Sequence, residues 1–170
     1  MIMLLVKKFK LLCLFFFCIL SLPALAAKNS FAQYDRFYIS GAPKEKDLED
    51  FKKKTGAYVI DLRSINEMGS CSEPATAGKL GLQYRKVSFE KAENISPEVI
   101  RDIDKSVNEA GGKPVLLFCK TGNRAAAWLA IHLVEKQHMN LEEAVKIAQG
   151  VGLKADGEKG VRSYFKTLEK

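Results

Sequence analysis

The stretch Val115-Leu116-Leu117-Phe118-Cys119-Lys120-Thr121-Gly122-Asn123-Arg124 decides the fold. Four consecutive apolar residues after Pro114 are typical of a strand that is buried on both faces of a parallel sheet. The residues from Arg124 to Gln137 are apolar on nearly every side, which predicts a central helix. The loop between them therefore joins a buried strand to a buried helix, at the end of the sheet where α/β proteins bind ligands.

Outward from this stretch, short apolar strands alternate with amphipathic helices. This alternation predicts a single α/β domain, with a central, mostly parallel sheet flanked by helices. Residues 28–33 are expected to be a flexible lead into the domain and residues 63–72 a loop. The predicted strands cover residues 37–39, 57–62, 83–89 and 115–118, and the predicted helices cover 44–54, 73–80, 97 to the glycines at 111–112, 124–137, 141–149 and 159–168.

The loop from Cys119 to Arg124 has the composition of an anion site. Backbone N–H groups at a helix N-terminus attract an anion. Gly122 permits a backbone conformation that closes the loop tightly, and the planar fork of Arg124 can bind two oxygens at once. A cysteine in that field is favoured as the thiolate, the nucleophilic form. The alternative is a buried cysteine that only fills space at a strand end.

The loop and its surroundings resemble the cysteine-phosphatase superfamily, and most closely the bacterial beta-lactamase-hydrolase-like phosphatase family, a branch of the dual-specificity phosphatase fold. The resemblance runs from Phe37 to about Gly152. It implies a cysteine-phosphatase-like fold and hydrolysis of a phosphate monoester through a phosphocysteine on Cys119. It also implies that Arg124 and the backbone of the loop bind the phosphate oxygens. The segments that carry it are Tyr38-Ile39-Ser40-Gly41, Val59-Ile60-Asp61-Leu62-Arg63, Gly81-Leu82-Gln83-Tyr84, Ile95-Ser96-Pro97-Glu98 and Cys119-Lys120-Thr121-Gly122-Asn123-Arg124.

Three positions depart from the pattern of that superfamily. Four residues separate Cys119 from Arg124, whereas most tyrosine phosphatases have five. Ala125 stands where such phosphatases usually carry a Ser or Thr that steadies the thiolate leaving group. The general acid, usually an Asp about thirty residues before the cysteine, has Glu90 and Glu93 as its candidates here. A glutamate can protonate a leaving group if it is well placed, and Glu90 aligns better than Glu93.

Two other function classes stay open. The short Cys–Arg spacing also resembles rhodanese sulfurtransferases, which would carry a persulfide on Cys119, and Ile60-Asp61-Leu62-Arg63-Ser64 followed by Glu67 resembles the start of those domains. The Gly-His-Ile-Pro-Gly-Ala stretch of rhodaneses is missing, which favours the phosphatase. The third class is a non-catalytic module that binds anions or senses redox state.

The N-terminus has the order of a secretory signal peptide. Lys7, Lys8 and Lys10 precede an apolar run over residues 11–22, and Ala24-Leu25-Ala26 offers small residues for cleavage after Ala26. We therefore expect residues 1–26 to be a signal peptide, residues 27–170 to be the phosphatase-like domain, and the mature protein to be periplasmic or secreted, with no membrane attachment after cleavage. The alternative is an N-terminal anchor that is not cleaved.

The charge pattern of the sequence restricts the classes of partner that we expect. The formal net charge of +7 includes three leader lysines, and the other basic residues are interleaved with acids, which argues against nucleic acid. The expected partner is a phosphorylated small molecule or a phosphoprotein, with no cofactor and no metal. Cys71 follows the predicted strand 57–62, so it is a candidate redox partner that forms a reversible disulfide with Cys119; an unpaired thiol is the alternative.

Overall fold

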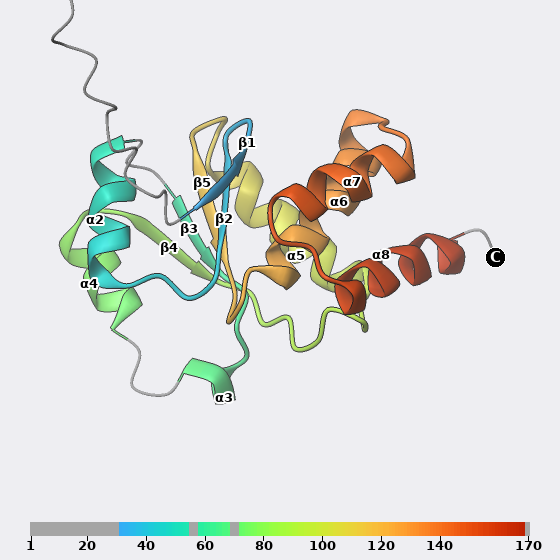
Figure 1. Cartoon of the computed structure of the whole chain (residues 1–170). Coiled ribbons are helices and arrows are strands. Elements are labelled where there is room, and N and C mark those ends of the chain that lie inside the picture. Colours follow the sequence, from blue (N-terminus) through green and yellow to red (C-terminus); the bar gives the residue numbers. More distant parts are fainter. Residues whose placement is uncertain (1–30, 55–57, 69–71, 169–170) are drawn as a thin grey trace, which may run out of the picture.

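The computed structural model describes residues 31–54, 58–68 and 72–168. It confirms a single α/β domain in which helices cover both faces of a mostly parallel five-stranded sheet (Figure 1). The expected signal peptide with its cleavage site, and Cys71, lie outside the described residues. The elements are β1 Ala32–Tyr34, β2 Phe37–Ser40, α2 Glu45–Lys54, β3 Tyr58–Asp61, α3 Ile65–Met68, α4 Glu73–Lys79, β4 Gln83–Lys86, α5 Pro97–Glu109, β5 Val115–Phe118, α6 Asn123–Gln137, α7 Leu141–Gly150 and α8 Ala155–Leu168.

The strand order is β1-β2-β5-β3-β4, with β5 at the centre. Every residue of β5 is buried, as its apolar run predicts. In the register of the sheet, Ser40 and Asp61 both stand opposite Phe118. The carboxyl ends of β2, β3 and β5 therefore lie at one edge of the sheet, and the loops that follow them meet there.

The two faces of the sheet carry separate hydrophobic cores. On one face α2 and α4 pack against the sheet, with Leu48 and Phe51 completely buried. On the other face lie α5, α6, α7 and α8, with α6 closest to the centre (Figure 1). Trp128 and Leu129 of α6 have no exposed surface. The helix is buried on nearly all sides because α5, α7, α8 and the sheet surround it.

Four of the predictions on secondary structure were wrong: a strand and a short helix were missed, and two boundaries were misplaced. Residues 32–34 form β1, an antiparallel edge strand that pairs with β2, and not a flexible lead. A short helix, α3, interrupts the loop predicted over 63–72. Strand β4 ends at Lys86 rather than at residue 89. Helix α8 begins at Ala155, four residues before the predicted start, because apolar periodicity is weak in its first turn.

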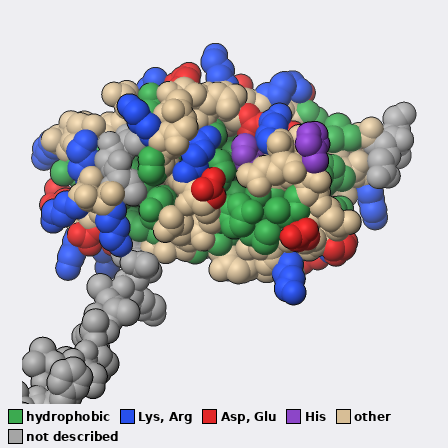
Figure 2. Space-filling view, turned by 90° about the horizontal axis from the view of Figure 1, so that it is seen from above, with side chains coloured by type: hydrophobic (Ala, Val, Ile, Leu, Met, Phe, Trp, Pro, Cys, Tyr) green, Lys and Arg blue, Asp and Glu red, His purple; other side chains and the backbone are tan. Residues whose placement is uncertain are grey.

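The surface carries mixed charge. On the face shown in Figure 2, Lys and Arg side chains are scattered with Asp and Glu among them, as the interleaved sequence predicts. Within the described residues, no helix is both long enough and apolar enough to cross a membrane. No group of three or more His, Cys, Asp or Glu side chains in that part of the chain could hold a metal ion.

Candidate active site

The loop after β5 closes around the sulfur of Cys119. This side chain is only 1% exposed, and the backbone N–H of Gly122 donates a hydrogen bond to its Sγ at 3.1 Å. Gly122 has a φ of 93°, in the left-handed region that favours glycine. A β-carbon there would also lie 3.3 Å from the carbonyl carbon of Ser40. Glycine is thus required both by the turn and by the neighbouring chain.

The end of β2 supports the loop from the side. The N–H of Cys119 donates to the carbonyl of Ser40, and the N–H of Ala42 donates to the carbonyl of Lys120, both at 3.4 Å. Gly41 pairs with Thr121 in an isolated bridge, and a β-carbon on Gly41 would lie 3.1 Å from the Lys120 carbonyl oxygen. The Ser40-Gly41 pair therefore lets the β2 backbone approach the loop closely and fix its path.

Arg124 is held by acceptors on one side of its guanidinium group. Its Nη1 donates to Glu67 Oε2 at 2.7 Å, to the Glu90 carbonyl at 3.1 Å and to the Phe89 carbonyl, and it lies 3.4 Å from the Leu62 carbonyl. Its Nη2 donates to Glu67 Oε1 at 2.8 Å. Among the described residues, these bonds use both Nη1 hydrogens and one on Nη2. The edge formed by Nε–H and the second Nη2–H is left for an anion, and the guanidinium group also interacts with the Cys119 sulfur. A guanidinium group binds two oxygens along that edge.

The charges around Arg124 keep it ionised. Burial alone would lower the pKa of Arg124, but the bonds to Glu67 and the proximity of Cys119 outweigh burial and raise it. The bidentate bond from Arg124 in turn lowers the pKa of Glu67. The pair is therefore fully charged at neutral pH, with a positive group beside the cysteine.

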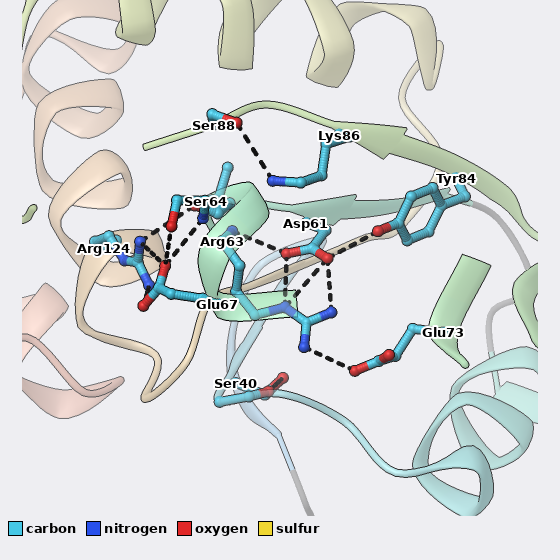
Figure 3. A network of polar contacts seen from close by, with 12 residues as sticks. Ser40, Asp61, Arg63, Ser64, Glu67, Glu73, Tyr84, Lys86, Ser88 and Arg124 are labelled. Carbon is cyan, nitrogen blue, oxygen red and sulfur yellow. Dashed lines mark hydrogen bonds and ion pairs between the residues drawn. The ribbon is translucent and has the colours of Figure 1, made fainter. Parts of the chain in front are cut away.

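Glu67 is the main residue that the sequence analysis did not assign to the phosphatase site. It lies on α3, and its Oε2 accepts hydrogen bonds from both the backbone N–H and the hydroxyl of Ser64 (Figure 3). Ser64-Ile65-Asn66-Glu67 is an S-x-x-E pattern, in which the glutamate reaches back to the residue that starts a helix. That pattern could have revealed both α3 and the orientation of Glu67.

A buried ion cluster anchors the segment that carries Glu67. Asp61 accepts three bonds of 2.7–3.2 Å from the Arg63 side chain and one of 2.7 Å from the Tyr84 hydroxyl (Figure 3). Arg63 also contacts Glu73 at 2.9 Å. Burial alone would lower the pKa of Arg63, but Asp61 and Glu73 outweigh it and raise it. The cluster ties Arg63, before α3, to Glu73 at the start of α4, and so fixes both ends of the segment that presents Glu67.

A pocket of about 210 Å³ opens beside the loop. The structure brings most of the predicted site residues together there: Lys120, Thr121, Asn123 and Arg124 line the pocket, and so does Glu90. Cys119 and Gly122 are buried beneath the surface. Three further residues line the pocket: Glu67, which the sequence suggested only as part of the rhodanese resemblance, Asp156, which it did not suggest, and Glu93, the weaker candidate for the general acid.

Two of the sequence predictions concern the Cys119 sulfur: the missing hydroxyl at Ala125 and the disulfide with Cys71. Ala125 is completely buried at the start of α6 and offers no hydroxyl to the sulfur, whereas the Gly122 backbone does donate to Cys119 Sγ. The hydroxyl of Ser40 is directed to the Gly41 carbonyl at 2.7 Å. The pairing of Cys119 with Cys71 stays a prediction, because Cys71 lies outside the described residues.

Comparison with known proteins gives matches among solved structures alone. No protein-family model and no curated protein sequence matches the chain. A DUF442 protein of Shewanella putrefaciens superposes with a TM-score of 0.63 at 18% identity, covering 79% of this chain and 90% of that one. PTPMT1 in complex with PI(5)P gives 0.65 at 16% identity, covering 82% and 97%. TpbA of Pseudomonas aeruginosa, in complex with phosphotyrosine, gives 0.61 at 16% identity, covering 82% and 90%. The chain thus has the fold of protein-tyrosine-phosphatase-like enzymes.

Proposed function

We propose that this chain is a cysteine-dependent phosphatase that hydrolyses a phosphate monoester through a phosphocysteine intermediate on Cys119. The observation that carries the proposal is the orientation of Arg124. Glu67 and backbone carbonyls occupy one side of its guanidinium group and leave two N–H groups for an anion next to Cys119. The likeness in fold to PTPMT1 and TpbA supports the same chemistry.

In the first step the Cys119 thiolate attacks phosphorus. An S–P bond forms while the ester P–O bond breaks, and the departing oxygen takes a proton from the proposed acid, Glu90. Arg124 and the N–H groups of residues 120–124 stabilise the charge on the transferring phosphoryl group. Stabilisation by such pre-organised donors usually contributes more to catalysis than any other single effect.

In the second step water attacks the phosphocysteine. The deprotonated Glu90 accepts a proton from that water, the S–P bond breaks, and inorganic phosphate leaves with the thiolate restored. Gly122 N–H donates to Sγ in the free enzyme, and it is the donor available to stabilise the departing thiolate where Ala125 offers no hydroxyl. We therefore expect slow turnover at this step.

The substrate is proposed as a phosphorylated small molecule or a phosphoprotein. PI(5)P is bound by PTPMT1 and phosphotyrosine by TpbA, so both a lipid headgroup and a protein side chain are compatible with this fold. A place in the beta-lactamase-hydrolase-like branch is part of the same proposal and rests on the sequence segments that carry that resemblance. The leader sequence supports a periplasmic or secreted location.

The test is hydrolysis of p-nitrophenyl phosphate by the purified, reduced protein. Cys119→Ser should reduce the rate to background, and Arg124→Lys should reduce kcat/KM at least about 100-fold, because lysine keeps the charge but loses the planar fork. Cys71→Ser is the matched control, the same substitution at another cysteine, and should retain activity. A wild-type protein with no turnover would remove this function; transfer of sulfur from thiosulfate to cyanide by the same sample would then establish the sulfurtransferase.

A further inference from the structure

Helix α8 approaches two parts of the candidate site through a pair of buried glycines. A β-carbon on Gly160 would lie 1.9 Å from the carbonyl oxygen of Ala92, and one on Gly157 would lie 2.4 Å from Asn123 Oδ1. Neither distance is compatible with a side chain in the present arrangement. Glycine at both positions therefore permits a close approach of the helix to its neighbours.

The first turn of α8 is also hydrogen-bonded to the anion loop. The backbone N–H of Lys154 donates to Asn123 Oδ1 at 2.7 Å, and Asn123 Nδ2 donates to Asp156 Oδ1 at 2.9 Å. Asn123 is 5% exposed and directly precedes Arg124. The amide of this one residue thus connects the start of α8 to the residue that presents the guanidinium group.

The second contact of α8 is the segment that carries the candidate acid. Ala92 is buried, whereas Glu90 and Glu93 on either side of it are exposed and line the pocket. On its other side this segment is held by Arg124, which donates to the Phe89 and Glu90 carbonyls. Segment 89–93 therefore lies between Arg124 and Gly160.

We propose that α8 is the positioning element of the active site, with Gly160 setting how closely the acid-bearing segment 89–93 approaches the anion loop. The inference rests on the proposed function. If Gly160 gained a side chain, the Ala92 carbonyl would have to move. Glu90, two residues away, would then lose its position relative to the departing oxygen. Proton donation would then weaken while the attack by Cys119 on phosphorus would persist.

The experiment compares two esters that differ in their need for a proton. Phenyl phosphate has a poor leaving group that requires an acid, whereas 2,4-dinitrophenyl phosphate departs without one. Since general acid catalysis contributes about 10²–10⁴-fold, Gly160→Ala should lower kcat/KM for phenyl phosphate at least about tenfold and that for the dinitrophenyl ester less than about threefold. Gly150→Ala is the matched control, since a β-carbon on Gly150 of α7 meets nothing within 4 Å, and it should alter neither value.

A second pair of variants tests the same helix without steric conflict. Asp156 is exposed, so Asp156→Ala should fold normally while losing the bond from Asn123 Nδ2. It should shift the ratio of the two kcat/KM values in the same direction by about threefold. Asp156→Asn keeps an oxygen acceptor and should restore the ratio. Failure of the asparagine to restore it would show that the charge of Asp156, and not the bond from Asn123, sets the ratio, and would overturn its positioning role.

The outcomes distinguish failure of this inference from failure of the proposed function. Unchanged kcat/KM values for both esters in folded Gly160→Ala overturn the role of α8 and leave the phosphatase intact. Equal losses with both esters overturn it as well, because a general disturbance would then explain the change. A wild-type protein that hydrolyses neither ester overturns the proposed function and the inference together.

Discussion

At the scale of single residues, the pair Glu67–Arg124 organises the site. The carboxylate binds the guanidinium through both oxygens, at 2.7 and 2.8 Å. Bidentate pairs of this kind fix orientation as well as charge. The glutamate is in turn held by Ser64, so the direction in which Arg124 presents its free N–H groups is set by α3 and not by the anion loop alone.

Glu67→Gln should therefore reduce kcat/KM for an aryl phosphate about five- to tenfold. Glutamine keeps one acceptor oxygen but loses the charge, and bonds to charged groups exceed neutral ones by about 1 kcal/mol. Steady-state kinetics, with inhibition by inorganic phosphate as a second readout, would measure the change. Glu98→Gln removes a comparable glutamate–arginine contact, to Arg101 on the surface of α5, and should have no effect. Equal kinetics for Glu67→Gln and wild type would show that the anion loop orients Arg124 unaided.

At the scale of elements, helix starts illustrate how local sequence fixes local structure. Ser96 precedes Pro97 at the start of α5, and its hydroxyl accepts a bond from the N–H of Val99 at 3.4 Å. Ser72 holds the same position before α4, but its side chain makes no capping bond. Two serines at the N-cap position of their helices therefore differ in what they contribute.

Ser96→Ala should lower the free energy of unfolding by about 1 kcal/mol, the usual cost of losing an N-cap. Ser72→Ala should change it by less than about 0.5 kcal/mol, the range of ordinary surface substitutions. Urea unfolding followed by circular dichroism would compare the two. A cost for Ser72→Ala as large as that for Ser96→Ala would contradict the difference in capping.

At the scale of the whole molecule, buried carboxylates make stability depend on pH. Asp104 of α5 accepts a bond from Trp128 Nε1 of α6 at 2.9 Å and faces Lys136 at 3.4 Å and His132 at 3.5 Å. Burial alone would raise the pKa of Asp104, but the nearby His132 and the bond from Trp128 outweigh it, so the pKa is lowered below its usual 3.8. A carboxylate with a lowered pKa stabilises the folded state above its unfolded-state pKa and loses that contribution as pH falls through the folded value.

The protein should consequently lose stability as the pH falls below about 4, and Asp104→Asn should flatten that loss. At pH 7 the variant should be less stable than wild type by about 1 kcal/mol, because asparagine still accepts from Trp128 but without a charge. Urea unfolding at pH 7 and pH 3 would give both values. If the free energy of unfolding falls equally steeply with pH in the two proteins, other carboxylates cause the loss of stability at acid pH.

Local sequence was sufficient to specify the central strand, the buried helix after it, the parallel α/β class and the loop from Cys119 to Arg124, because each of these depends on neighbours in the chain. The apolar run of β5 and the cap at Ser96 are signals of that kind. Only the folded arrangement brings Glu67 to Arg124 across 57 positions of sequence and places Gly160 against Ala92. The pairing of residues 32–34 with β2 as an edge strand is likewise a tertiary outcome. Contacts of this kind depend on how the carboxyl ends of three strands and the start of α8 converge in space, and no local pattern encodes that convergence.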